Sequence, residues 1–172
     1  MHAEYIDVSK ATIENILSNL NAPVIAVGTT SLRTIESLYW LGVKQSLVNS
    51  RQSTVGHLLS LGLSQWEVYE LAKENILSEV ALRSLLQWMD ENKMERLLTK
   101  TQIIIAPGYQ FKIANALITN FHQPQSTLLL LVAALIGNDW KEVYEYALQH
   151  DFRFLSYGDG CLLWANESDN AG

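Results

Sequence analysis

The residues Leu128–Ile136 form an unbroken apolar run, and they limit what the chain can fold into more than any other stretch. The run is much shorter than the roughly 20 residues that a membrane-spanning helix needs. A helix that is apolar on every face must be buried. Either Ser126 or Thr127 can cap such a helix, and Gly137 can end it. The stretch therefore predicts a short helix in the core of a globular domain.

A polar loop precedes this helix. Leu117 and Ile118 have the character of a strand end, and Thr119–Gln123 carries many hydrogen-bonding groups. Pro124 disfavours helical backbone at the residue before it. The positive end of a buried helix would then face polar side chains, which is an arrangement that can bind an anion or another polar ligand. The alternative is an ordinary strand–loop–helix junction, because most such junctions bind nothing.

A second junction has the same form. Val24–Val27 is typical of a buried strand, Gly28–Ser31 follows it, and a helical pattern begins at Leu32 with Gly42 as a possible stop. The single glycine and the missing lysine exclude a P-loop or a dinucleotide fingerprint. The three hydroxyls can bind a ligand at the helix start. Alternatively, Thr30 or Ser31 only caps the helix.

Strand-like and helix-like patterns alternate along the chain. Strands are expected at Met1–Val8, Val24–Val27, Leu47–Val48, Gln102–Ala106, Phe111–Ile113, Leu117–Ile118, Phe152–Leu155 and Cys161–Trp164. Helices are expected at about 9–20, 32–42, 64–71, 78–91 with an extension over 94–98, 128–136 and 138–150. We therefore expect residues 1–172 to form a single layered α/β domain with a largely parallel (mixed) sheet flanked by helices. The polar segments 28–31, 119–122 and 156–159 should converge at one sheet edge.

Composition narrows the class of protein further. With 48% hydrophobic and 17% charged residues the chain is globular, and a single cysteine excludes an internal disulfide. The first ten residues lack an apolar core segment, so we expect a cytoplasmic protein without a membrane anchor. The four histidines have no ligand-like spacing, so no metal site is expected. A net charge of −6 disfavours a large nucleic-acid footprint.

Several segments together resemble a known family, the S-adenosylmethionine:tRNA ribosyltransferase-isomerases. The residues that carry the resemblance are Met1–Glu4, Gly28–Ser37, Pro107–Tyr109 with Phe111 and Lys112, Leu117–Leu131 and Phe152–Asp159. Several segments in a fixed order are far more specific than one motif. The resemblance covers most of the chain and implies that it corresponds to the C-terminal part of the family's α/β catalytic domain.

The chain departs from the family pattern in three ways. Residues 58–101 are expected to be a helical insertion. Asn115 and Ala116 stand where the family has Asp-Gly, so Asn115 cannot act as a base. Family members are also longer, with an N-terminal segment and an inserted β-barrel before the Met-His-x-Glu motif. The chain is therefore expected to be either a fragment or a truncated relative.

The resemblance implies an enzyme of queuosine biosynthesis. Such enzymes transfer the ribosyl moiety of S-adenosylmethionine to 7-aminomethyl-7-deazaguanine in tRNA and isomerise it, which gives epoxyqueuosine. S-adenosylmethionine is then the ribosyl-donor substrate, and no prosthetic group is expected. The alternative is a non-catalytic remnant that binds S-adenosylmethionine or requires a separate N-terminal half. A Ser/His hydrolase is disfavoured, because the Gly-x-Ser-x-Gly spacing is absent.

The chemistry requires a base beside the sulfonium. His122 is the first candidate, because an imidazole titrates near neutral pH. Asp159 is the second, either as a base or as a group that orients His122. For His122 the alternative is a structural, hydrogen-bonded loop residue.

The other candidates bind substrate. Asn120, Ser126 and Thr127 can bind the ribose hydroxyls or the methionine carboxylate. Tyr157 can stack on a base. Phe121 and Gly158 belong to the motifs that match the family, and they are further candidates for contact with substrate. For Tyr157 and Phe121 the alternative is packing.

The second junction, after Val24–Val27, adds three candidates. Thr29, Thr30 and Arg33 can hold adenine, a carboxylate or a tRNA phosphate. For Arg33 the alternative is a surface pair with Glu36, three residues along the helix. The candidate phosphate ligands are scattered over Arg33, Lys44, Arg51, Lys112 and Arg153. We therefore expect this chain alone to bind tRNA weakly.

Overall fold

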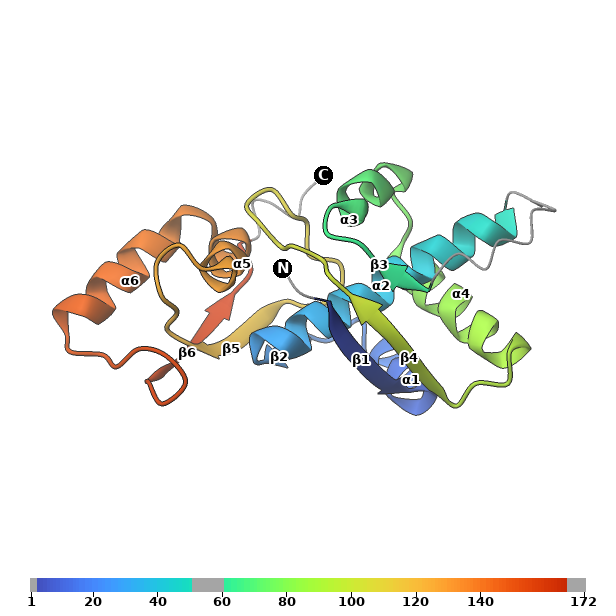
Figure 1. The fold of residues 1–172 in the computed structure, drawn as a ribbon, viewed down its shortest axis with the longest axis horizontal. Helices are drawn as coiled ribbons and strands as arrows, with labels where there is room; N and C mark the ends of the chain where they lie inside the picture. Colours follow the sequence, from blue (N-terminus) through green and yellow to red (C-terminus); the bar gives the residue numbers. More distant parts are fainter. Residues whose placement is uncertain (1–2, 51–60, 167–172) are drawn as a thin grey trace. The chain divides into compact units, whose positions relative to one another are not determined.

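The structure is a computed structural model that describes residues 3–50 and 61–166. The chain divides into two compact units. The first comprises residues 1–22 and 34–103, and the second comprises residues 23–33 and 104–172. Each is described by itself below, and Figure 1 labels the elements of both. No helix in the described ranges is long and apolar enough to cross a membrane.

The first unit contains a three-stranded sheet of order β1-β4-β3. Its strands are β1 (Glu4–Ser9), β4 (Arg96–Thr101) and β3 (Gly62–Leu63). The β1–β4 pair is antiparallel and the β3–β4 pair is parallel. Its helices are α1 (Lys10–Ser18), α3 (Glu67–Leu71), the 3-10 turn η1 (Ala72–Glu74) and α4 (Ser78–Glu91).

Helix α2 (Thr29–Ser50) runs from the second unit into the first. The expected stop at Gly42 and the expected strand at Leu47–Val48 are therefore wrong. A Cβ atom at Gly42 would lie 2.1 Å from the carbonyl oxygen of Ala81 in α4. Glycine is thus required here because a second helix backbone comes close to α2, and its presence does not end the helix.

Other expected elements also differ. Residues 94–98 do not extend α4, since β4 begins at Arg96 and its side chains alternate between exposed and buried positions. The apolar segments 102–106, 111–113 and 152–155 are not strands. Ile103 and Ile105 are nevertheless buried, so the apolar character was correctly linked to burial. Periodicity alone cannot distinguish a buried irregular segment from a buried strand.

The second unit contains the sheet β2-β5-β6, made of β2 (Ile25–Val27), β5 (Ala116–Asn120) and β6 (Gly160–Trp164). Helix α5 (Thr127–Ile136) packs on β6, and the turn η2 (Gly137–Asp139) leads into α6 (Trp140–Gln149) (Figure 1). Seven of the ten residues of α5 are buried, as the apolar run predicts. Ser126 is its N-cap and accepts a hydrogen bond from the backbone N–H of Leu129.

The α/β class is confirmed, with strands distributed over two small mixed sheets. In the second unit β2 and β5 are parallel, so both end at the same edge of the sheet. Strand β6 is antiparallel to β5 and pairs Gly160 with Asn120, so it starts at that edge. The segments that follow β2 and β5 and precede β6 therefore converge, as expected from the sequence.

Candidate functional site

The candidate site lies at this edge of the β2-β5-β6 sheet. The backbone N–H of Gly28, which follows β2, donates to the carbonyl oxygen of Ile118 in β5 over 2.8 Å. Gly28 has φ +86°, a conformation that glycine adopts without steric penalty. The chain can therefore leave β2 sharply and begin α2 at the next residue, which brings the start of this helix to the end of β5.

Thr29 and Thr30 occupy the first turn of α2. Since the helix already begins at Thr29, the alternative that Thr30 or Ser31 caps it is wrong. Arg33 is only 5% exposed and Glu36 is fully buried, so neither lies on the helix surface as that alternative expected. The hydroxyls of Thr29 and Thr30 thus remain candidates for a ligand at this edge.

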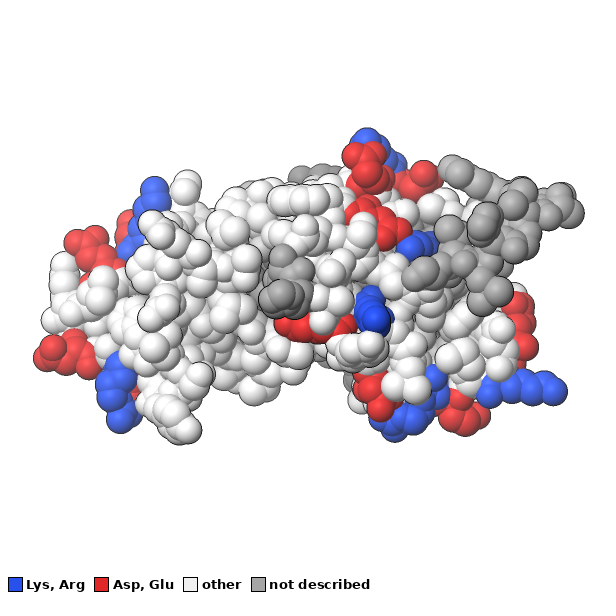
Figure 2. Space-filling view, in the orientation of Figure 1, with Lys and Arg blue, Asp and Glu red and all other residues white. Residues whose placement is uncertain are grey.

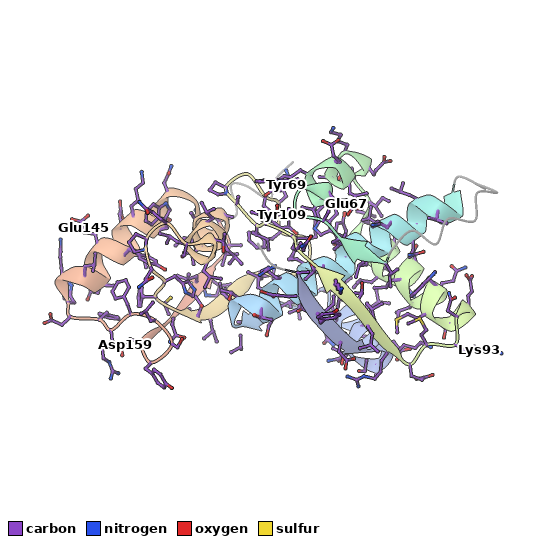
Figure 3. All side chains as sticks on the ribbon, in the orientation of Figure 1. Glu67, Tyr69, Lys93, Tyr109, Glu145 and Asp159 are labelled. Carbon is purple, nitrogen blue, oxygen red and sulfur yellow. The ribbon has the colours of Figure 1, made fainter. Side chains whose placement is uncertain are left out.

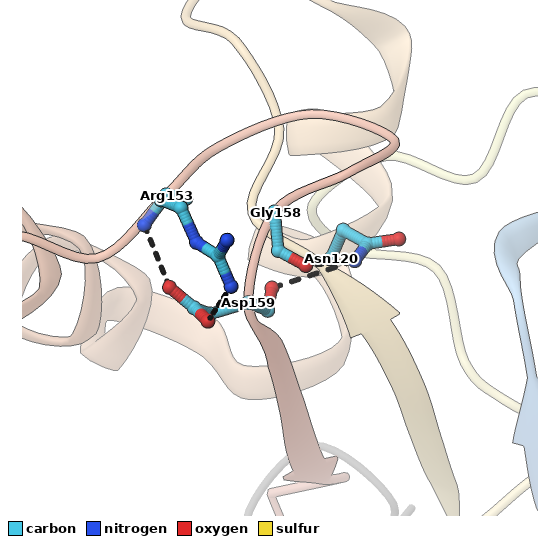
Figure 4. A network of polar contacts seen from close by, with 4 residues as sticks. All are labelled: Asn120, Arg153, Gly158 and Asp159. Atoms are coloured by element: carbon cyan, nitrogen blue, oxygen red, sulfur yellow. Dashed lines mark hydrogen bonds and ion pairs between the residues drawn. The ribbon is translucent and has the colours of Figure 1, made fainter.

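Asn120 ends β5 and holds the segment 151–159, here called the return loop. Its side-chain Nδ2 donates to the carbonyl oxygens of Gly158 over 3.0 Å and Asp159 over 3.5 Å (Figure 4). The backbone N–H of Leu155 donates to the carbonyl oxygen of Phe121. Asn120 therefore attaches the return loop to the strand, and its amide nitrogen is already engaged by protein.

Asp159 lies on the loop that precedes β6 (Figure 3). Its two carboxylate oxygens accept from Arg153, one from the backbone N–H over 2.8 Å and one from the guanidinium over 3.1 Å. These two interactions lower the pKa of Asp159 below its ordinary value of 3.8. A carboxylate with a lowered pKa is a weak base, and this one accepts hydrogen bonds from Arg153.

Gly158 allows the return loop to close tightly. A Cβ atom at this position would lie 2.3 Å from the carbonyl oxygen of Arg153 and 2.7 Å from the carbonyl carbon of Phe154. Both are backbone atoms, which cannot rotate away. Gly158 therefore has a steric role within the loop, and its predicted contact with substrate stays a prediction.

His122 follows β5 and is half-buried. One ring nitrogen, Nε2, lies 3.0 Å from the hydroxyl of Thr119, and its backbone N–H donates to the phenol oxygen of Tyr144 over 3.0 Å. Burial lowers the pKa of His122 below its ordinary value of 6.5. The lowered pKa favours the neutral imidazole, and a neutral imidazole can accept a proton.

Phe121 packs among aromatic rings of the second unit, and its place among the substrate ligands stays a prediction. Its ring is 3% exposed and contacts the rings of Tyr144, Phe152 and Phe154, at centroid distances of 5.3 to 5.5 Å. Such aromatic contacts stabilise a fold beyond the area they bury. The cluster anchors the return loop and α6 beneath the His122 loop.

Tyr157 has the opposite environment. It lies at the tip of the return loop and is 96% exposed, so packing is excluded as its role. A fully exposed aromatic ring next to a candidate site is available to stack on a base.

Ser126 and Thr127 lie at the start of α5, where the chain also lines a cavity of about 330 Å³. The hydroxyl of Ser126 donates to the carbonyl oxygen of Gln123 over 2.8 Å and accepts from the backbone N–H of Leu129 over 3.1 Å. Both bonds serve the cap. Thr127 lines the cavity and remains the better candidate for contact with a ligand.

Three residues with structural roles at the site were missed. Thr119 contacts the ring of His122, Tyr144 accepts from its backbone, and Arg153 holds Asp159. A buried tyrosine hydroxyl requires a partner, so Tyr144 on the inner face of a predicted helix carried a usable signal. The contacts of Thr119 with His122 and of Arg153 with Asp159 depend on how their loops fold, which local sequence patterns do not indicate.

Asn115, the departure from the family's Asp-Gly pair, has a defined role. Its side-chain oxygen accepts from the backbone N–H of Val24 over 2.8 Å, immediately before β2. Asparagine and aspartate both offer this oxygen, so the substitution retains the acceptor and removes the charge.

Charged side chains of both signs occur on the face drawn in Figure 2. On the face drawn in Figure 2, lysine and arginine side chains stand in small separate groups, most of them beside acidic ones. In the described ranges, no three His, Cys, Asp or Glu residues come together as metal ligands would.

Comparisons with known proteins point to one family. A family profile described as "Queuosine biosynthesis protein" matches residues 1–163. An S-adenosylmethionine:tRNA ribosyltransferase-isomerase of Cereibacter sphaeroides is 34% identical over 166 residues, which are 95% of this chain and 34% of that protein. The protein of the same name from Vesicomyosocius okutanii is 34% identical over 169 residues, 96% of this chain and 35% of that protein.

A solved structure is also similar. The crystal structure of an S-adenosylmethionine tRNA ribosyltransferase from Thermotoga maritima has 28% sequence identity and a TM-score of 0.55. The match covers 92% of this chain and 39% of that one. This chain thus spans about a third of the length of the curated relatives it matches.

Proposed function

The chain belongs to the queuosine biosynthesis protein family, and on that premise we propose that it modifies tRNA with S-adenosylmethionine as ribosyl donor. The ribosyl moiety is transferred to 7-aminomethyl-7-deazaguanine and isomerised to an epoxycyclopentanediol, which gives epoxyqueuosine. Adenine and methionine are the leaving groups. The names of the relatives support the donor and the acceptor class.

The reaction needs a neutral base close to the 5′ carbon of the donor, where the sulfonium makes the protons acidic. His122 has this role in our proposal. The observation that carries it is the half-buried imidazole, whose pKa is lowered by burial and whose ring is held by Thr119 at the converging loops. A base must be in the correct protonation state and within hydrogen-bond reach of the proton.

The other residues position substrate and loops. Thr29, Thr30 and Thr127 contact the donor, and Tyr157 stacks on a base of the tRNA. Asn120 and Asp159 keep the return loop closed beside His122, as their bonds to Gly158 and Arg153 suggest. Asp159 therefore acts through the loop and not as the proton acceptor.

The test is release of adenine from S-adenosylmethionine in the presence of tRNA that carries 7-aminomethyl-7-deazaguanine. Release should require the tRNA and should be lost in His122→Ala. His150→Gln is a matched control, because His150 stacks on Tyr146 at the end of α6 and has no place in the site. Release that persists in His122→Ala would remove His122 from the role of base.

A further inference from the structure

The cavity at the start of α5 is set apart by the chemistry of its lining. Its apolar lining residues come from three segments of the second unit and are Pro107, Leu129, Leu130, Ala133 and Trp140. Its polar lining is confined to Gln125, Ser126 and Thr127, which are consecutive. No lining residue carries a charge. At about 330 Å³ it falls within the size range of small-molecule sites.

The two polar groups available to a ligand are an amide and a hydroxyl. Ser126 is committed to its cap, as its bonds to Gln123 and Leu129 show. Gln125 and Thr127 remain at the polar side. A glutamine amide offers one acceptor and two donors in a plane, which matches the N6 and N7 edge of adenine.

Trp140 links this cavity to the catalytic loop. Its ring packs edge-on against Tyr144 at a centroid distance of 6.0 Å, and the Tyr144 hydroxyl accepts from the backbone N–H of His122. The cavity and His122 are also joined through the chain, since Ser126 donates to the carbonyl oxygen of Gln123. A ligand in the cavity would thus lie beside the loop that carries His122.

We infer that this cavity binds the adenine ring of the donor, with Trp140 as a stacking wall and Gln125 on the amino edge; the inference rests on the proposed function. S-adenosylmethionine has one flat, uncharged part, its adenine. The methionine part carries an ammonium, a carboxylate and the sulfonium, whereas no lining side chain carries a charge. The adenine is therefore the part of the donor whose chemistry matches these walls.

The test is calorimetric titration of the whole chain with adenosine, which needs neither tRNA nor turnover. Trp140→Leu keeps an apolar side chain and removes the stacking surface. It should weaken adenosine and S-adenosylmethionine about ten-fold or more, as loss of a base-stacking ring does. Trp140→Phe should restore part of the affinity. Trp164→Leu is the matched control: Trp164 is a half-exposed tryptophan of β6 outside the cavity, and its loss should leave adenosine affinity unchanged.

A second variant covers the case in which Trp140→Leu does not fold. Gln125→Ala should reduce the affinity for adenosine to that for purine riboside, which lacks the amino group. The inference is overturned if wild-type chain does not bind adenosine at millimolar concentration, if Trp140→Leu binds it normally, or if guanosine binds more tightly than adenosine. The last result would assign the cavity to the deazaguanine base.

This failure is distinguishable from failure of the proposed function. If Trp140→Leu releases adenine with an unchanged KM for S-adenosylmethionine, the function stands and the adenine cavity does not. If adenosine binding depends on Trp140 but no adenine is released, the cavity is an adenine site and the proposed transferase activity is wrong.

Discussion

The ring Nε2 of His122 lies 3.0 Å from the hydroxyl of Thr119, three residues earlier in the chain. Thr119 belongs to β5 and is buried, so its hydroxyl is fixed by the sheet. The ring orientation of His122 is thus set by the strand that ends beside it. The backbone of His122 is held separately by Tyr144 of α6. Two elements therefore position one imidazole at the edge where the loops converge.

The pH dependence of activity follows from this environment. Burial lowers the pKa of His122 below 6.5, and a base works in its deprotonated form. Activity should therefore be retained at pH 6.5 and fall only at lower pH, as the ring takes up a proton. The measurement is kcat/KM between pH 5 and 8. An acid limb centred clearly above pH 6.5 would contradict the assignment of His122 as the base.

The variant His122→Ala removes the imidazole. It should lower kcat by about 10²- to 10⁴-fold, the usual contribution of a general base.

Asp159→Asn separates a role in the loop from a role in proton transfer. The amide still offers one oxygen to Arg153, and the charge is lost. We expect reduced activity with the acid limb of the pH profile unchanged, because His122 keeps its environment. The pH profile of kcat/KM is the readout. Complete loss of activity together with disappearance of the limb would identify Asp159 as the base.

Two glycines of the same segment should respond differently to alanine. Gly158→Ala places a Cβ atom 2.3 Å from the carbonyl oxygen of Arg153, whereas the nearest contact for Gly160→Ala is 3.7 Å from the carbonyl oxygen of Thr119. Gly158→Ala should lower the free energy of unfolding by about 1–3 kcal/mol, as overpacking does. Gly160→Ala should fold nearly as well as wild type. Denaturant unfolding measures the free energy of unfolding of both variants. Equal values would show that the return loop has room for a Cβ atom at position 158.

Tyr157 should affect binding and not stability. Its ring is 96% exposed, so Tyr157→Ala should change the free energy of unfolding by no more than about 0.5 kcal/mol. The loss of one stacked base should weaken tRNA binding by about 1–3 kcal/mol, and Tyr157→Phe should retain most of it. Filter binding at fixed salt, together with thermal unfolding, measures both effects. Unchanged tRNA affinity in Tyr157→Ala would exclude stacking.

Much of the second unit was predictable from local patterns. The cap at Ser126, the buried α5 and the shared edge of β2 and β5 all follow from apolar periodicity and from the rule that ligand sites lie at strand ends. Helix α4 also has the predicted bounds. The cap and the two helices depend on residues close together in the chain, where sequence patterns are most informative.

The differences depend on contacts that form only in the folded chain. Gly42 predicts a helix stop from sequence alone, and only the structure shows that Ala81 lies against it. Likewise, only the structure shows that the return loop brings the Arg153 guanidinium to the Asp159 carboxylate. Phe121 matched a family motif, and only the fold shows that its ring packs on three other aromatic rings. The pattern of the sequence does not contain such pairings.

The most direct test of the central claim is adenine release from S-adenosylmethionine by the whole chain, with tRNA carrying 7-aminomethyl-7-deazaguanine. The proposed function predicts release that requires this tRNA, is lost in His122→Ala and persists in His150→Gln. No release by the wild-type chain would contradict the claim that it is itself the transferase. The family assignment, which rests on the sequence match over residues 1–163, would stand.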